Sequence, residues 1–261
     1  MRREEMRRAD QRSKRAAAGA ALLLLSMGLS CGGEQPPPFC TISRATYAAR
    51  YELVSGQGAC AELKGEVLGG QAYVPDPTKN DDFGSLAIQS DAMGKRILAG
   101  EAMMPPVVDA NKSHKPYAYG GFKSRTPDAD NVCTVPKLSD AELEQEAVMS
   151  GMEMLPPIHV KYHWSNVKSY VTTAQIGVLW GGELDYTLGD CTAKYKVVAI
   201  SPMVSCADEG GKADPHLCVA EPDPKSGFAG SGLNPDIEVK CDPDLLLCVP
   251  AKAFPSLESK K

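Results

Sequence analysis

The amino-acid sequence predicts a mainly β protein, with an antiparallel meander or β-sandwich-like domain, two short helices and a disulfide-stapled C-terminal lobe. Three observations lead to this prediction. Apolar and polar residues alternate along residues 158–199, nine cysteines lie among 261 residues, and 43% of the residues are hydrophobic, enough for a real core. The chain divides into a signal peptide at 1–30, a tether at 31–39, a mainly β domain at 40–205 and a Cys-rich lobe at 206–261, expected to pack on that domain.

The first thirty residues have the charge and length of an export signal. Residues 1–15 carry seven basic and three acidic side chains, and an apolar run of fifteen residues follows at 16–30. That run is shorter than the ~20 residues of a transmembrane helix and matches the apolar core of a signal peptide. A buried amphipathic helix is the alternative, but the run has no polar face. We therefore expect export and removal of this segment.

The end of the apolar run, Gly28-Leu29-Ser30-Cys31-Gly32, resembles the lipobox of bacterial lipoproteins. The resemblance implies that the Cys31 sulfur carries lipid and that Cys31 becomes the mature N-terminus. Gly28 departs from the leucine usual at that place, so ordinary secretion with cleavage near Ser30 is the alternative. Because no acidic residue directly follows Cys31, the resemblance implies an outer-membrane location. Residues 32–38 are proline-rich and suit an extended spacer.

Cysteine parity agrees with a lipidated Cys31. Eight cysteines remain, which allows four disulfides in an oxidising compartment. They are Cys40, Cys60, Cys133, Cys191, Cys206, Cys218, Cys241 and Cys248. Sequence alone leaves the pairing open, and proximity favours Cys206–Cys218 and Cys241–Cys248. A zinc site is the alternative, but the sequence contains no C-x2-C pair.

Before the meander, the pattern predicts strands at 41–54, 66–74 and 85–89, the second of them broken by Gly69-Gly70. A short helix is predicted at 91–101, with Ser90 or Asp91 as its cap. Residues 103–130 hold several prolines and no periodicity, which predicts a long surface loop and a candidate interaction region. The capping-box spacing of Ser139 and Glu142 predicts a second helix from 139 to about 152.

The region 158–205 carries the period-2 pattern of half-buried strands. The phase slips near Ser165-Asn166, which predicts a β-bulge. Turn signals at Gly181-Gly182 and Gly189-Asp190 divide the region into about four strands. Six aromatic residues of this region are expected in the core more than on a ligand surface: Tyr162, Trp164, Tyr170, Trp180, Tyr186 and Tyr195.

Chemistry-bearing motifs are few, and we predict no metal and no cofactor. His159 and His163 lie about 13 Å apart on a strand, too far to bind one metal ion together. His114 and His216 are expected to be solvated in loops. Carboxylates at 236, 238, 242 and 244 lack the order of an EF-hand loop and read as turn residues.

The sequence also lacks the best-known catalytic and nucleotide-binding motifs. Outside the export segment, where Gly28 to Gly32 match the spacing G-x-S-x-G, it contains no G-x-S-x-G elbow. It contains no P-loop or G-x-G-x-x-G fingerprint, and Ser231 has no identifiable base nearby. A catalytic group assembled in space would escape such a search. A secreted hydrolase is therefore kept as the alternative function.

The charge balance excludes some partners. The whole chain has a net charge of −5, and without residues 1–30 it keeps 21 basic and 30 acidic side chains, a net charge of −9. Such a chain is a poor partner for nucleic acid or anionic headgroups. Membrane contact is therefore expected through acyl chains.

Several segments resemble a family of predicted myxobacterial lipoproteins: Cys31 after the apolar run, residues 45–51, residues 191–197 and residues 234–248. The resemblance implies an origin and a location, and no catalytic residues. The predicted function is a lipid-anchored, non-catalytic binding or structural module of the outer membrane, with a protein, glycan or envelope partner.

Overall fold

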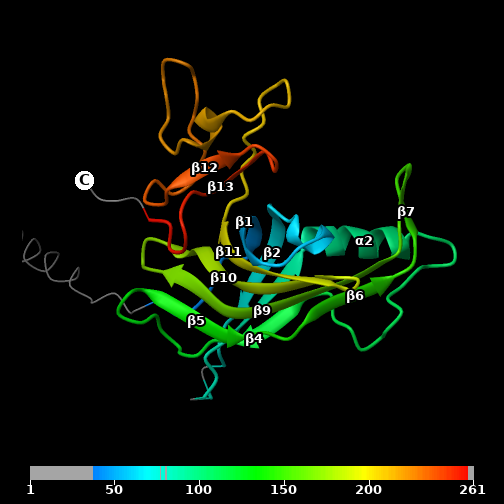
Figure 1. Ribbon diagram of the computed structural model, residues 1–261. Helices are drawn as coiled ribbons and strands as arrows, with labels where there is room; N and C mark the ends of the chain where they lie inside the picture. The colour runs from blue at the N-terminus through cyan, green and yellow to red at the C-terminus, as the bar shows by residue number, and fades with distance from the viewer. Residues whose placement is uncertain (1–37, 77, 80, 258–261) are drawn as a thin grey trace, which may run out of the picture. The chain divides into compact units, whose positions relative to one another are not determined.

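Nine antiparallel strands form the main sheet of the computed structural model, which describes residues 38–76, 78–79 and 81–257 (Figure 1). The order is β4-β3-β2-β1-β11-β10-β9-β5, and β6 also pairs with β9. Two meanders, β1 to β4 and β9 to β11, therefore meet where β1 pairs with β11. The strands are β1 (Ala45–Ser55), β2 (Gly65–Tyr73), β3 (Ser85–Ser90), β4 (Ala118–Gly121), β5 (Val132–Lys137), β6 (Ala141–Gln145), β9 (Ile158–Val171), β10 (Ile176–Leu188) and β11 (Cys191–Ile200). The predicted mainly β class is confirmed.

The predicted meander consists of three long strands, not four. The bulge is confirmed: the register against β10 shifts between Ser165 and Lys168, and Asn166 has a φ of 49°. The turn at Gly189-Asp190 joins β10 to β11, as predicted. The turn predicted at Gly181-Gly182 is wrong, because both glycines lie inside β10. A Cβ at Gly181 would come within 2.9 Å of Phe254, so close packing explains that glycine better than a turn does.

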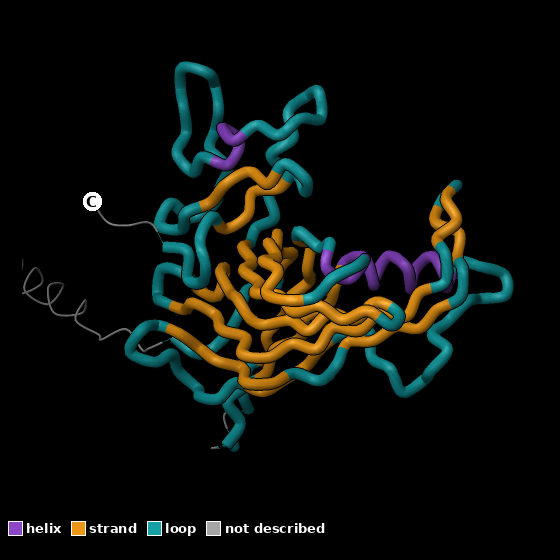
Figure 2. Tube along the Cα trace, in the orientation of Figure 1, coloured by secondary structure: helices purple, strands orange, loops and turns teal. Residues whose placement is uncertain are grey.

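Helix α2 (Asp91–Glu101) begins where it is predicted. The Ser90 hydroxyl accepts a hydrogen bond from the Met93 N–H at 3.4 Å and caps the first turn. The Lys95 ammonium lies 2.6 Å from the Asp91 carboxylate, one turn away. Met93 is buried in the main core. Figure 2 shows this helix as the one long purple element beside the strands.

The helix predicted at 139–152 is wrong. Residues of this segment form β6 and then a hairpin of β7 (Val148–Ser150) and β8 (Glu153–Leu155). Ala141, Leu143 and Gln145 are buried on alternate positions against β9, which is strand periodicity. The Ser139 hydroxyl accepts a hydrogen bond from the N–H of Tyr119, on another strand, instead of capping a helix. The expected loop at 103–130 also contains a short strand, β4.

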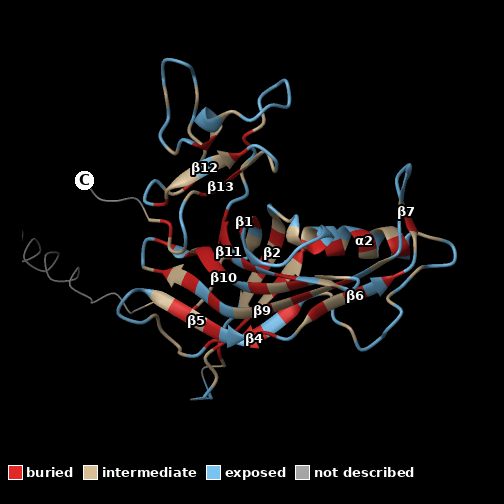
Figure 3. Cartoon of the chain, viewed as in Figure 1, coloured by how far each residue is buried: buried red, intermediate tan, exposed pale blue. Residues whose placement is uncertain are grey.

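The main core lies on the inner face of the sheet. The sheet curls so that hydrogen bonds join the segments around β4 and β5, the strands at its two ends. Lys123 N–H donates to the Thr134 carbonyl and Ser139 N–H to the Tyr119 carbonyl, both at 2.8 Å. The largest fully buried side chains include Trp164 and Trp180, as the alternation predicts. Figure 3 shows buried residues recurring along the long strands of the sheet.

The C-terminal lobe packs on the outer face of the same sheet. Its hairpin, β12 (Val239–Asp242) and β13 (Leu247–Pro250), shares a second apolar cluster with the outward side chains of β1, β10 and β11. A 3-10 helix, η2 (Pro215–Cys218), lies beside β12, and another, η1 (Ala59–Ala61), lies beside β11. Residues 206–257 therefore form a second apolar cluster together with the part of the sheet that they cover.

Four disulfides join the eight remaining cysteines, with Cα–Cα distances of 5.4–5.8 Å. The pairs are Cys40–Cys133, Cys60–Cys191, Cys206–Cys241 and Cys218–Cys248. The two pairs that proximity favours, Cys206–Cys218 and Cys241–Cys248, are wrong. Cys241 and Cys248 face each other across β12 and β13, and each bonds instead to a cysteine of the preceding loop. Chain pairing between 204–206 and 246–248 brings Cys206 to this hairpin.

Among the residues that the structure describes, none of the helices has the length and apolarity needed to cross a bilayer. Cys31 and the segments 1–30 and 31–37 lie outside the described residues.

Candidate functional site

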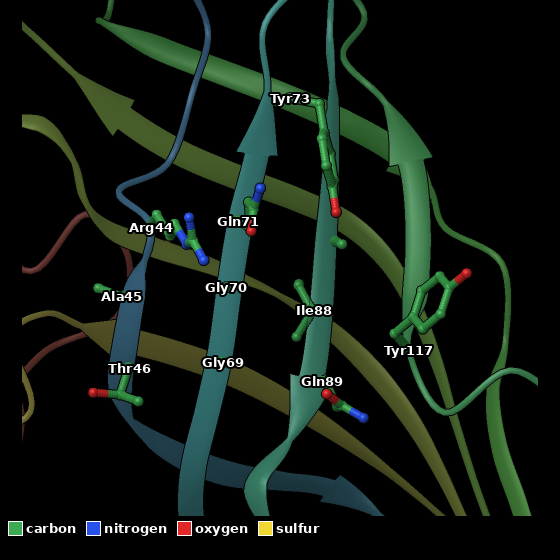
Figure 4. Close-up of a pocket in the computed structure, with 11 residues that line it drawn as sticks. Arg44, Ala45, Thr46, Gly69, Gly70, Gln71, Tyr73, Ile88, Gln89 and Tyr117 are labelled. Carbon is green, nitrogen blue, oxygen red and sulfur yellow. The ribbon is translucent and has the colours of Figure 1, made fainter. Parts of the chain in front are cut away.

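A trough with a volume of about 520 Å³ crosses β1, β2 and β3 (Figure 4). Eleven residues line it, from these three strands, from the residue just before β1 and from the loop before β4. They are Arg44, Ala45, Thr46, Gly69, Gly70, Gln71, Tyr73, Ala87, Ile88, Gln89 and Tyr117. The volume is in the range of ordinary small-molecule sites. Its size and its polar and aromatic lining make it the leading candidate site.

The strand register explains why the sheet is hollow here. Thr46, Gly69 and Gln89 stand side by side on β1, β2 and β3. A Cβ on Gly70 would meet the core side chains of Ile42 and Tyr47, so its neighbour Gly69 faces outward. A Cβ on Gly69 would meet only the Gln89 carbonyl oxygen, at 3.7 Å. The missing side chain of Gly69 thus leaves the floor of the trough open between two polar walls.

Four polar side chains surround that floor: Arg44, Thr46, Gln71 and Gln89. In the described part of the chain, none of the four makes a side-chain hydrogen bond or an ion pair with another residue. Together they offer a guanidinium, a hydroxyl and two amides, so both donors and acceptors are free. Polar groups in this state can bind a ligand without first breaking bonds within the protein.

Two tyrosines stand at the same trough. Tyr73 is 48% exposed and Tyr117 is 42% exposed. The ring of Tyr119, also exposed, lies 6.1 Å from the ring of Tyr73 and extends the aromatic surface. Exposed aromatic rings beside free polar groups are typical of recognition surfaces.

Sequence reasoning did not identify these residues as a site. The aromatic residues that it weighed as a ligand surface were those of the meander. It favoured the core for them, and the structure buries Trp164, Trp180 and most of the others there. Gly69-Gly70 was the available signal, but it predicts a break in a strand that the structure shows to be continuous from Gly65 to Tyr73. Tyr117 does come from the loop that the sequence marks as a candidate interaction region.

The two histidines that were predicted not to share a metal ion, His159 and His163, each form a hydrogen bond with a different carboxylate. His159 Nε2 is 2.7 Å from Glu142, and His163 Nδ1 is 2.6 Å from Asp140. Lys161, between them on β9, contacts both carboxylates. Partial burial raises the pKa of Glu142 and Asp140, but hydrogen bonds from these histidines and from Lys161 outweigh it and hold both pKa values below their ordinary range. These five side chains form a ladder of contacts between carboxylates and basic groups: Asp140, Glu142, His159, Lys161 and His163, on β9 and on or next to β6.

His114, expected to be solvated, joins the end of this ladder. Its Nδ1 lies 3.1 Å from Asp109 and its Nε2 lies 3.6 Å from Glu142. Its ring is parallel to that of His159, with the centroids 6.3 Å apart. His114 therefore ties the loop after α2 to β6.

The four C-terminal carboxylates do not converge. Asp242 accepts hydrogen bonds from the N–H groups of Asp244 and Leu245, which is a turn-stabilising arrangement. Asp236 contacts Gln175, and Glu238 pairs with Lys252. Three sulfur atoms, those of Cys206, Cys218 and Cys241, lie within 4.8 Å of one another, but the structure places them in two disulfides.

Comparison with known proteins gives one family and one curated relative. The MlpA family model matches residues 45–202. A Myxococcus xanthus protein named "Putative lipoprotein MlpA" is 24% identical over 254 residues, covering 91% of this chain and 97% of that protein. No solved structure matches the chain. The matched region runs from β1 past the end of β11 and contains every residue of the trough except Arg44.

Proposed function

Because this chain belongs to the MlpA family of myxobacterial lipoproteins, we propose that it is a lipid-anchored envelope protein that binds a ligand without transforming it. The anchor is the lipidated sulfur of Cys31, and residues 1–30 are the signal that is removed. Residues 31–39 then hold the β domain of 40–205 and the Cys-rich lobe of 206–261 away from the bilayer. The outer membrane is the expected location, since Gly32 and Gly33 follow Cys31 without an acidic residue.

Three observations support the anchor. Residues 16–30 are apolar and directly precede Cys31, and the relative that covers most of this chain is named a lipoprotein. The structure pairs the other eight cysteines with one another, so Cys31 is the one left over from the four disulfides. An odd cysteine in an exported protein calls for such a separate role.

One observation carries the binding function: the Gly69 trough brings free polar side chains and exposed tyrosines together on the sheet. The same sheet is covered elsewhere, on its inner face by the core and on part of its outer face by the C-terminal lobe. The uncovered hollow is therefore where a partner has both space and hydrogen-bonding groups.

Intact mass spectrometry of protein extracted from its host's membranes tests the anchor. We expect a chain that lacks residues 1–30 and carries a diacylglyceryl group at its N-terminus. The Cys31→Ser variant should lose the lipid mass and leave the membrane fraction, whereas Ser26→Ala should behave as the wild type. A mature chain that retains residues 1–30 contradicts this proposal.

Binding of the full-length, detergent-extracted protein to the envelope fraction of its host tests the second part. The variant Gly69→Leu fills the trough without touching the core, and we expect it to weaken binding about tenfold. Gly94→Leu is the matched control. Gly94 lies on α2 and not among the residues of the trough, and a Cβ there would meet nothing within 4 Å. Equal binding by both variants would show that the trough is not the binding surface.

A further inference from the structure

We propose that the trough binds a neutral glycan chain, an inference that rests on the binding function proposed above and names its ligand. The ligand class follows from three properties of the lining residues: their hydrogen-bonding chemistry, their aromatic surface and their charge.

The first property is the mixture of donors and acceptors. Gln71 and Gln89 each offer a carbonyl oxygen and an NH2 group, Thr46 a hydroxyl, and Arg44 a planar set of N–H donors. A sugar carries neighbouring hydroxyl groups that both donate and accept. Because these four side chains make no bonds with other described residues, each is free to pair with such hydroxyls.

The second property is the position of the tyrosines. Tyr73 lies near one end of the trough, and Tyr117 lies across from Arg44, on the far side of β3 (Figure 4). A sugar ring has an apolar C–H face that packs on an aromatic ring, while its hydroxyls point to the sides. Aromatic surface combined with amides therefore fits a sugar better than it fits a purely apolar or purely ionic ligand.

The third property is charge. Arg44 is the one charged residue of the eleven that line the trough, and no carboxylate is among them. A single cation is weak recognition for a polyanion, and the missing carboxylates disfavour a basic peptide. Neither argument applies to a neutral ligand.

The position of the trough argues against a peptide strand. Peptides that extend a sheet need an edge with unpaired N–H and C=O groups. β2, at the centre of the trough, is paired on both sides, with β1 and with β3. Recognition here must use side chains, as glycan recognition does.

Isothermal titration of the full-length protein in detergent tests the proposal. The probes are neutral hexasaccharides of glucose, mannose, galactose and N-acetylglucosamine, together with hexasaccharides of uronic acids. We expect at least one neutral probe to bind, with affinity reduced about tenfold or more by Gly69→Leu and by Gln71→Leu. Gly94→Leu should leave the affinity unchanged, and thermal melting confirms that each variant is folded.

The tyrosines provide a second readout. Tyr117→Ala should weaken binding of the neutral probe about tenfold, and Tyr117→Phe, which keeps the ring, should restore most of it. A purely structural role for Tyr117 would change the melting temperature instead of the affinity.

The outcomes separate this inference from the proposed function. Binding of uronic acid probes alone overturns the neutral class. If no probe binds while Gly69→Leu still weakens binding to the envelope fraction, the glycan inference is wrong and the binding function stands. If envelope binding is also insensitive to Gly69→Leu, both are wrong.

Discussion

Glu66 is a carboxylate held by hydroxyl groups inside the curled sheet. Its Oε1 accepts a hydrogen bond from Tyr51 at 2.5 Å, and its Oε2 accepts from Ser90 at 2.5 Å and from Tyr162 at 3.4 Å. Burial raises the pKa of Glu66 above its ordinary value, although these hydrogen bonds oppose the rise. Burial and the Glu66 charge together raise the pKa of Tyr51 and Tyr162 as well. The network joins β1, β2, β3 and β9.

The raised pKa sets the sign of a pH effect on stability. The folded chain holds the Glu66 proton more tightly than the unfolded chain, so this contribution to stability is present at acidic pH. It is lost as the pH rises through the raised pKa. The variant Glu66→Gln keeps a polar group beside the hydroxyls without the partly buried charge. We therefore expect it to equal or exceed the wild type in stability near neutral pH, and to lose that advantage in acid.

Urea unfolding from about pH 4 to about pH 8 measures this difference. Glu153→Gln removes an exposed carboxylate and is the control, for which we expect a constant offset across the range. A Glu66→Gln variant that is less stable at neutral pH than in acid, relative to wild type, would mean that the charge of Glu66 stabilises the fold.

The burial of single residues was predictable only where the local sequence pattern determines it. Trp164 and Trp180 lie on the apolar phase of an alternating run, and both are buried, as predicted. The Glu66 network and the trough depend on the strand register instead. Thr46, Gly69 and Gln89 are distant in sequence and adjacent only after three strands pair. Sequence pattern carries no information about that register.

At the scale of elements, α2 offers a direct test of helix propensity. Gly94 lies inside this helix, and a Cβ there would meet nothing within 4 Å. Gly94→Ala should stabilise the protein by about 0.5–1 kcal/mol, because alanine loses less backbone entropy on folding. Thermal unfolding should show a rise of about 1–4 °C in Tm.

Gly100, also in α2, is the opposing control. A Cβ at this position would overlap with the Val107 carbonyl and the Gln145 side chain. Gly100→Ala should therefore lower stability, by about 1–3 kcal/mol. If both alanine variants move Tm in the same direction, local packing does not decide the effect of glycine in this helix.

Element predictions succeeded where one face meets the core and the other meets water. β9 satisfies that condition, as do β10 and β11 outside the part that the C-terminal lobe covers, and their alternation is plain in the sequence. The prediction failed at 139–152 because a capping-box spacing was given more weight than the alternation of Ala141, Leu143 and Gln145. It failed at Gly181 because close approach of another segment demands glycine just as a turn does.

At the scale of the whole molecule, the disulfides join segments far apart in sequence. Cys40–Cys133 and Cys60–Cys191 span 93 and 131 residues, and the two bridges of the lobe span 35 and 30. The first pair fastens the chain before β1 to β5, and the second fastens η1 to β11. In the chain-entropy description each such loop contributes about 3–5 kcal/mol. The bridges are thus a large part of what holds this fold together.

Peptide mapping of the unreduced protein tests the pairing in the lobe. Cleavage after lysine separates Cys206 from Cys218, in peptides 197–212 and 213–225, but leaves Cys241 and Cys248 together in peptide 241–252. The pairing of the structure, Cys206–Cys241 and Cys218–Cys248, must therefore link all three peptides into one species. Pairing by sequence proximity would instead link the first two peptides and leave the third alone.

A second cleavage on the N-terminal side of aspartate resolves the remaining ambiguity, because Asp242 and Asp244 separate Cys241 from Cys248. We then expect the fragment with Cys206 to carry the one with Cys241, and the fragment with Cys218 to carry the one with Cys248. The opposite exchange would place Cys206 on the wrong strand of the β12–β13 hairpin, and would contradict the chain pairing of 204–206 with 246–248. Free thiols at these four positions in protein from its native envelope would contradict the disulfides of the lobe. In that case the sulfur atoms of Cys206, Cys218 and Cys241, which lie within 4.8 Å of one another, would be close enough to bind a metal ion.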